Sequence, residues 1–234
     1  MDIKGKNILV TGGSKGLGRA TAELLIAHGA NVIITARNGA YLTQVANEIG
    51  AFAIQGDMSV EEDIIRVFEV CMRKFERLDA VINNAGLVRG RGPITESNLE
   101  DWEYVFSVNV FGAAMVGKHA AKIFKQQNYG NIVNIGSTAA TKGYEGGSIY
   151  VASKFAVRGM TDCWREELRK YNVRVILINP TYVPTAFGTN DGQEKKVEDK
   201  LVKPTDIAHS IYSALAMDDK AFITELTVWA TNPF

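Results

Sequence analysis

The chain has 234 residues, of which 46% are hydrophobic and 22% charged, and its 26 basic residues balance 26 acidic ones. This charge balance argues against nucleic-acid binding as a main role, and the longest apolar runs are far shorter than the ~20 residues of a membrane span. The first residues, MDIKGK, lack the apolar stretch of a signal peptide, and Cys71 and Cys163 form no metal-binding or disulfide pattern. We therefore expect a cytoplasmic globular protein without a metal site.

Short apolar runs rich in β-branched residues alternate with longer amphipathic stretches along the whole sequence. The pattern predicts strands at 7–11, 31–35, 51–55, 80–83, 131–135, 173–178 and 222–229. Helices are predicted at 17–28, 41–49, 61–75, 99–127, 150–170 and 205–216. This alternation indicates βαβ units, so we expect one doubly wound α/β domain over residues 1–234, with a mainly parallel sheet and helices on both faces.

One segment differs in composition from the rest of the chain. Residues 189–200, TNDGQEKKVEDK, are charged and nearly devoid of apolar side chains. They lie between the end of a predicted strand and a predicted helix, where a mobile surface loop is expected. We therefore predict a flexible substrate loop near residues 186–203.

A glycine-rich turn, TGGSKGLG, joins the first predicted strand to the first predicted helix. Its glycines Gly12, Gly16 and Gly18 follow the spacing Gly-x3-Gly-x-Gly. Glycine allows positive φ and a close backbone approach to a ligand, and the N-terminus of the next helix offers unpaired N–H groups to a pyrophosphate. Because the turn connects a buried strand to a helix, it predicts a dinucleotide site.

The residues after the second predicted strand indicate which dinucleotide binds. Dinucleotide folds that take NAD commonly place an acidic residue there, for the ribose hydroxyls. This chain has Arg37 and Asn38 instead, and Lys15 adds a second cation inside the glycine-rich turn. Two cations without an acid suit the 2′-phosphate of NADP, so NADP(H) is the predicted cofactor.

The same turn also matches a different pattern. Residues 12–16 fit the G-x-S-x-G turn of α/β-hydrolases, with Ser14 as the nucleophile and His209 available to complete a triad. A serine hydrolase is therefore an alternative hypothesis, but it leaves Gly18 and the polar group described next unexplained.

Three polar residues in the second half of the chain suit hydride-transfer chemistry. Ser137 follows a predicted strand, at the strand end where doubly wound folds place their chemistry. Tyr150 and Lys154 are one helical turn apart and therefore share a helix face. We expect the charge of Lys154 to lower the pKa of Tyr150 toward the range of efficient acid–base catalysis, and Ser137 to donate a hydrogen bond to a substrate oxygen.

These motifs, in this order, resemble the short-chain dehydrogenase/reductase family over nearly the whole chain. The family's TGxxxGxG stands at residues 11–18, its NNAG at 83–86, and its aspartate after the third strand at Asp57. The helix asparagine that supports the active lysine through water corresponds to Asn109, and the catalytic serine, tyrosine and lysine to Ser137, Tyr150 and Lys154. The resemblance implies a Rossmann-type sheet of seven strands and nicotinamide chemistry.

The glycine-rich turn, the two predicted cations and the resemblance together give a set of cofactor-binding residues. They are Gly12, Ser14, Lys15, Gly16, Leu17, Gly18, Arg37, Asn38, Asp57, Met58, Asn84, Ala85, Gly86, Tyr150, Lys154, Pro180, Val183 and Thr185. The resemblance assigns Asp57 to the adenine and Thr185 to the nicotinamide carboxamide.

The sequence departs from the family pattern after the sixth strand, where Thr181 replaces a common glycine. The chain end also lacks the glycine-rich segment of 3-oxoacyl-acyl-carrier-protein reductases, which are otherwise the nearest common family members. Arg89 and Arg91 could bind a carboxylate or a carrier phosphate, or could be solvated surface charges. The polar loop is a poor wall for a long acyl chain, so a small or medium polar carbonyl or alcohol is the preferred substrate.

Two further expectations concern partners and activity. The resemblance implies a homodimer or homotetramer built on the two long helices, here at 99–127 and 150–170. A non-catalytic dinucleotide-binding regulator is the other alternative to a reductase, although such relatives usually lose a catalytic residue and this chain has all four.

Overall fold

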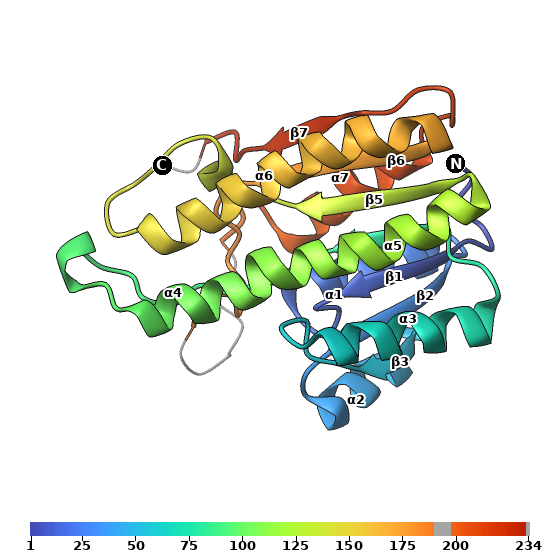
Figure 1. Cartoon of the computed structure of the whole chain (residues 1–234), viewed down its shortest axis with the longest axis horizontal. Coiled ribbons are helices and arrows are strands. Elements are labelled where there is room, and N and C mark those ends of the chain that lie inside the picture. The colour runs from blue at the N-terminus through green and yellow to red at the C-terminus, as the bar shows by residue number, and fades with distance from the viewer. Residues whose placement is uncertain (190–197, 233–234) are drawn as a thin grey trace.

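Seven parallel strands form one sheet in the computed structural model, which describes residues 1–189 and 198–232 (Figure 1). The strands are β1 (Asn7–Thr11), β2 (Asn31–Ala36), β3 (Phe52–Gln55), β4 (Ala80–Asn83), β5 (Gly130–Ile135), β6 (Val173–Pro180) and β7 (Glu225–Val228). Their order is β3-β2-β1-β4-β5-β6-β7, and each neighbouring pair is parallel. The predicted Rossmann-type sheet is therefore confirmed.

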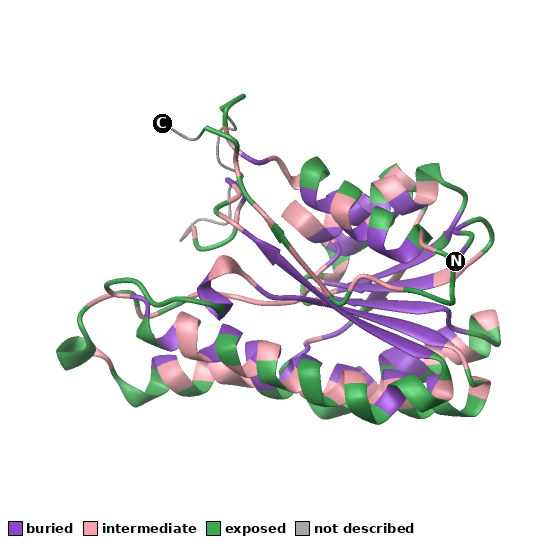
Figure 2. Cartoon of the chain, turned by 90° about the horizontal axis from the view of Figure 1, so that it is seen from above, coloured by how far each residue is buried: buried purple, intermediate pink, exposed green. Residues whose placement is uncertain are grey.

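Helices cover both faces of this sheet, because strands such as β1 and β6 are apolar on both sides and need two partners. One face packs against α1 (Gly16–Ala27), α2 (Gly39–Ile49) and α7 (Pro204–Ala216). The other packs against α3 (Glu61–Phe75), α5 (Ala113–Gln127) and α6 (Ser148–Leu168). Figure 2 shows the buried strands between these two helical layers, whose exposed sides point outward.

The predicted helix at 99–127 is divided into three parts. It consists of α4 (Leu99–Phe106), a wider π-helical segment at Ser107–Gly112, and α5. The last strand, β7, is shorter than the predicted 222–229: its pairing with β6 begins at Glu225, opposite Leu177, and ends at Val228, opposite Pro180. Within the described residues, no helix is both long and apolar enough to cross a membrane.

The order of the strands in the sheet determines where a ligand site is expected. The chain starts in the centre of the sheet, winds outward to β3, and returns to β4 on the other side of β1. In such sheets the crevice at the carboxyl ends of the two central strands is the usual ligand position. Here that crevice lies between the turns that follow β1 and β4.

Candidate functional site

A cavity of about 1000 Å³ lies at the carboxyl ends of the strands. It extends from the turn after β1 to the segment after β6, so it runs across the point where the strand order reverses. Most of the predicted site residues line it: Gly12, Ser14, Lys15, Gly16, Leu17, Arg37, Asp57, Met58, Asn84, Ala85, Gly86, Ser137, Tyr150, Lys154, Pro180, Val183 and Thr185. Gly18, Asn38 and Asn109 lie outside its lining.

The glycine-rich turn is shaped by close packing against the turn after β4. Gly12 has a φ of +64°, and a Cβ there would lie 3.0 Å from Asn84 Nδ2 and 3.1 Å from the Cα of Ala85. Gly18 serves packing within the turn, because a Cβ there would lie 2.3 Å from the carbonyl oxygen of Gly12. The start of α1 therefore faces the cavity, and the side chain of its N-cap residue, Lys15, does not cap the helix.

Hydrogen bonds join the two turns. The Thr11 hydroxyl accepts from the backbone N–H groups of Asn84 and Ala85, both at 2.9 Å. The Asn84 amide in turn donates to the carbonyl oxygens of Thr11 and Gly12, at 2.8 and 3.2 Å. Thr11 was not among the predicted site residues, although a polar side chain at the end of a buried strand was a usable signal.

The end of the cavity beside the carboxyl end of β2 is cationic. Arg37 directly follows β2, and its guanidinium donates to the Tyr104 hydroxyl at 3.0 Å, which raises the pKa of Arg37. The Lys15 ammonium lies 5.1 Å from the ring centroid of Tyr41. Asp57 is here too, but its carboxylate accepts from the backbone N–H and hydroxyl of Ser59. This end therefore presents two cations to a ligand.

Asn38 is predicted to bind the cofactor, and in this structure its side chain stabilises the start of a helix. Its side chain accepts from the backbone N–H of Tyr41 and so caps the N-terminus of α2. Asparagine after a strand and before a helix is typical of such a cap.

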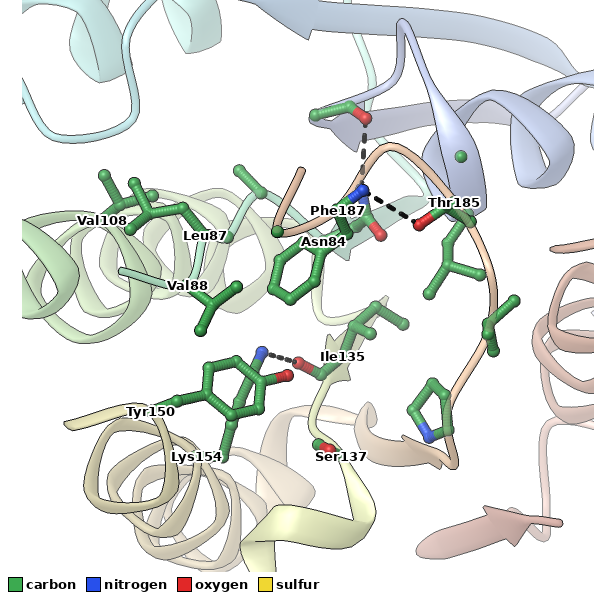
Figure 3. A pocket seen from close by; sticks show the side chains of 18 of the residues that line it. Asn84, Leu87, Val88, Val108, Ile135, Ser137, Tyr150, Lys154, Thr185 and Phe187 are labelled. Atoms are coloured by element: carbon green, nitrogen blue, oxygen red, sulfur yellow. Dashed lines mark hydrogen bonds between the residues drawn. The ribbon is translucent and has the colours of Figure 1, made fainter. Parts of the chain in front are cut away.

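At the opposite end of the cavity, Tyr150 and Lys154 project from α6 beside Ser137 (Figure 3). Lys154 is buried, and its ammonium donates to the carbonyl oxygen of Ile135 at 2.8 Å. Burial lowers the pKa of Lys154 to about 8. The predicted lowering of the Tyr150 pKa is wrong for this structure, because burial raises it to about 12 while a hydrogen bond with Ser137 opposes the rise.

A chain of polar side chains, which begins at the buried Asn179, holds Ser137 in place. The Ser137 backbone N–H donates to the side-chain oxygen of Asn179 at 3.2 Å, and the Asn179 amide donates to Glu225 at 2.6 Å. Glu225 forms a bidentate ion pair with Arg158 at 2.8 and 2.9 Å. Sequence reasoning missed these three residues. Asn179 follows the apolar run 175–178 within a fully buried strand, and this could have drawn attention to it.

Asn109 lies in the π-helical segment and binds the loop after β4. Its side-chain oxygen accepts from the N–H of Leu87 at 2.8 Å, and its amide donates to the Leu87 carbonyl at 2.9 Å and to the Ser153 hydroxyl at 3.1 Å. Ser153 donates in turn to the Tyr150 carbonyl. Asn109 therefore connects this loop to the helix that carries Tyr150 and Lys154.

The segment after β6 closes the cavity above the phenol. The Thr185 hydroxyl accepts from the N–H of Phe187 at 3.2 Å, and the Phe187 ring contacts the Tyr150 ring edge-on with centroids 5.9 Å apart (Figure 3). Thr181 donates its N–H to the Val228 carbonyl, so it continues the sheet. Of the substrate loop predicted near 186–203, residues 190–197 lie outside the described residues.

The histidines lie away from Ser14. His209 is on the exposed side of α7, His28 stacks on Tyr212, and His119 lies against Phe68. None of the three lines the described wall of the cavity that Ser14 lines. The structure therefore does not bring together the triad of the hydrolase hypothesis.

Comparison with known proteins matches residues 6–196 to the family described as short chain dehydrogenase. An NADP-dependent 3-hydroxy acid dehydrogenase of Schizosaccharomyces pombe is 29% identical, over 98% of this chain and 94% of the yeast protein. Among solved structures, an alcohol dehydrogenase of Thermococcus sibiricus complexed with 5-hydroxy-NADP has a TM-score of 0.90 at 25% identity, with 97% of each chain covered. A 3-ketoacyl-(acyl-carrier-protein) reductase of Brucella melitensis complexed with NADH has a TM-score of 0.88 at 26% identity, with 98% of each chain covered.

Proposed function

Since the chain belongs to the short-chain dehydrogenase family, we propose that it is an NADP(H)-dependent oxidoreductase that interconverts a ketone, or a 3-oxoacyl-type substrate, and the corresponding alcohol. One observation carries the proposal. Ser137, Tyr150 and Lys154 lie at one end of a cavity whose other end is the glycine-rich turn and Arg37. A dinucleotide that spans the cavity would reach both ends.

The residues present fit this cofactor. A pyrophosphate would bind at the start of α1, next to Gly12, where a Cβ would lie 3.0 Å from Asn84 Nδ2. Arg37 and Lys15 would hold the 2′-phosphate, and Asp57 and Met58 would lie beside the adenine. The NADP in the names of the yeast relative and of the Thermococcus complex supports NADP, while the Brucella complex contains NADH.

The bound nicotinamide supplies or accepts the hydride at the carbonyl carbon. Tyr150, whose pKa of about 12 keeps it protonated at neutral pH, gives its proton to the carbonyl oxygen during reduction and recovers it during oxidation. Ser137 is hydrogen-bonded to Tyr150 and would donate to the same oxygen as negative charge develops there. The buried Lys154 ammonium places a positive charge beside this group, and Asn109 fixes the neighbouring loop.

The assembly and the location of the protein stay predictions. A homodimer or homotetramer is expected to form on the helices α5 and α6. Phe111, just before α5, and Phe155, on α6, have exposed aromatic side chains. The cytoplasmic location is expected from the sequence alone.

The proposal is tested by NADPH and NADH oxidation against a panel of ketones, diketones and 3-oxoacyl thioesters, with Tyr150→Phe measured alongside. Loss of the proton donor is expected to lower kcat at least about 100-fold, while NADPH binding, followed by fluorescence, is retained. Turnover by Tyr150→Phe at the wild-type rate would contradict the assigned role of Tyr150. NADPH binding without turnover of any substrate would favour the non-catalytic regulator.

A further inference from the structure

Two arginines follow the NNAG motif, and the structure separates their roles. Arg89 forms ion pairs with Asp101 at 2.6 Å and Glu100 at 3.0 Å, and its guanidinium lies 5.3 Å from the ring centroid of Tyr104. Arg91 also lines the cavity. Within residues 1–189 and 198–232, the structure shows no ion pair or hydrogen bond of the Arg91 side chain. Its charge is therefore available to a ligand.

The guanidinium of Arg91 lies close to the reacting end of the cavity. A Cβ at Gly188 would be 3.7 Å from Nη2 of Arg91. Gly188 directly follows Phe187, whose ring packs edge-on against Tyr150. The positive charge of Arg91 also acts on the phenol, where it opposes the rise of the Tyr150 pKa. Arg91 and the proton donor therefore face the same part of the cavity.

The loop that carries Arg91 is held in place on both sides. Gly90 has a φ of +67°, and a Cβ there would lie 2.8 Å from the side chains of Asp101 and Ile149. Gly92 donates its N–H to the carbonyl oxygen of Gly146, on the loop before α6, at 3.2 Å. The backbone on each side of Arg91 is thus held against the helices α4 and α6.

The surroundings at this end are cationic as well. Lys142 also lines the cavity, with its ammonium 5.1 Å from the ring centroid of Trp229. Among the described lining residues, the single carboxylate is Asp57, and it lies at the opposite end beside Arg37. A substrate with a negative charge would be attracted to the end that holds Tyr150.

We propose that Arg91 binds a carboxylate of the substrate, which makes this chain specific for oxo acids and the corresponding hydroxy acids. The inference rests on the proposed function, since it concerns a substrate of the same site. A guanidinium matches a carboxylate with two parallel hydrogen bonds. Phe187 packs against Tyr150 and the next residue, Gly188, lies beside Arg91, so a short oxo acid would place its carbonyl at Tyr150 and its carboxylate at Arg91.

The test compares substrates that differ only in charge. Acetoacetate is the anionic probe, methyl acetoacetate its neutral counterpart, and acetoacetyl-coenzyme A and acetoacetyl-N-acetylcysteamine are thioesters with and without phosphates. The wild-type enzyme is expected to prefer acetoacetate to the methyl ester in kcat/KM. Arg91→Met is expected to lose about 10- to 100-fold in kcat/KM for acetoacetate, mainly through KM, and little for the ester.

Two matched variants make the readout specific. Arg91→Lys keeps the charge without the paired donors and is expected to retain part of the preference for acetoacetate. Arg89→Met removes the neighbouring arginine, which is held by Glu100 and Asp101, and is expected to leave the acid-to-ester ratio unchanged.

Three results would overturn the proposal. The first is an equal loss of kcat/KM for acid and ester in Arg91→Met. The second is a change of the acid-to-ester ratio in Arg89→Met as large as that in Arg91→Met. The third is a loss confined to acetoacetyl-coenzyme A, which would identify a phosphate as the anion. Each of them still requires turnover that depends on Tyr150. Failure of the proposed function would instead show as no Tyr150-dependent turnover of any of the four compounds.

Discussion

Lys154 illustrates how a functional residue destabilises the fold. Its ammonium is buried, with a single main-chain acceptor, and its pKa is lowered from 10.5 to about 8. Below pH 8 the folded state holds a charge that water would stabilise better, and this cost is fully present at pH 7. Between pH 8 and 10.5 the folded protein has lost this proton while the unfolded chain keeps it, so the contribution of Lys154 to stability improves as the pH rises.

Replacement of Lys154 by methionine is therefore expected to increase stability at pH 7 by about 1–2 kcal/mol, after allowance for the unpaired carbonyl of Ile135. The gain shrinks as the pH rises toward 10, and catalysis is lost. Urea unfolding at pH 7 and pH 9.5 measures both effects, with the exposed Lys122→Met on α5 as the control. A Lys154→Met protein that is less stable than the wild type at pH 7 would contradict this account.

Arg37 is the residue on which the choice of cofactor depends. Its guanidinium lies at the end of β2 and is held by the Tyr104 hydroxyl. Arg37→Gln is expected to raise the KM for NADPH about 10- to 100-fold and to leave the KM for NADH nearly unchanged, because only NADPH has the extra phosphate. Tyr104→Phe is expected to show the same trend with a smaller effect.

The control for this measurement is Arg19→Gln. Arg19 lies on α1, is paired with Glu23 and Glu48, and lies outside the cavity lining. An equal rise in the KM for both cofactors in Arg37→Gln would show that Arg37 supports the fold of the site and does not select the phosphate.

At the level of elements, the helical region at 99–127 shows how packing overrides a sequence rule. Gly112 ends the π-helical segment, and a Cβ there would lie 1.9 Å from the carbonyl oxygen of Met58. Glycine inside a helix normally costs stability relative to alanine. Here Gly112→Ala is expected to destabilise the protein by about 1–3 kcal/mol and to weaken NADPH binding, because Met58 lines the cavity.

Gly159 is the matched control within another helix. It lies on the exposed side of α6, and nothing is within 4 Å of the position that its Cβ would take. Gly159→Ala is expected to be neutral or to stabilise by up to about 1 kcal/mol. Thermal unfolding is therefore expected to show a lower Tm for Gly112→Ala and an unchanged or higher Tm for Gly159→Ala. A higher Tm for Gly112→Ala would contradict this account.

Periodicity predicted that residues 99–127 are helical, but it did not predict the widening at 107–112. A π-helical segment changes which backbone groups pair, not which residues are apolar, so the pattern of side chains carries little trace of it. The same limit applies to β7, whose bounds depend on which of its residues pair with β6. Elements that depend on a partner elsewhere in the chain are the ones that the sequence located least accurately.

For the molecule as a whole, the alternation of strands and helices was sufficient to predict the sheet, its parallel character and the strand ends that face the cavity. Most of the residues that line the cavity could be predicted for the same reason, since they lie at or after the carboxyl ends of strands β1 to β6. The Asn179–Glu225–Arg158 chain was not, because its members meet only through the pairing of β6 with β7 and the packing of α6. The Tyr150 pKa also depends on burial by distant segments such as the one that contains Phe187.

The four hydrogen bonds between Thr11, Asn84 and their neighbours have a dynamic consequence. They fasten the turn after β1 to the turn after β4, so neither turn can open without breaking contacts of the other. The amide protons of Asn84 and Ala85 should then exchange with solvent only when the central strands separate, at a free energy near that of global unfolding. The part of the cavity between these two turns is thus rigid before any ligand binds. The conformational entropy of these turns is lost during folding, so ligand binding does not have to order them.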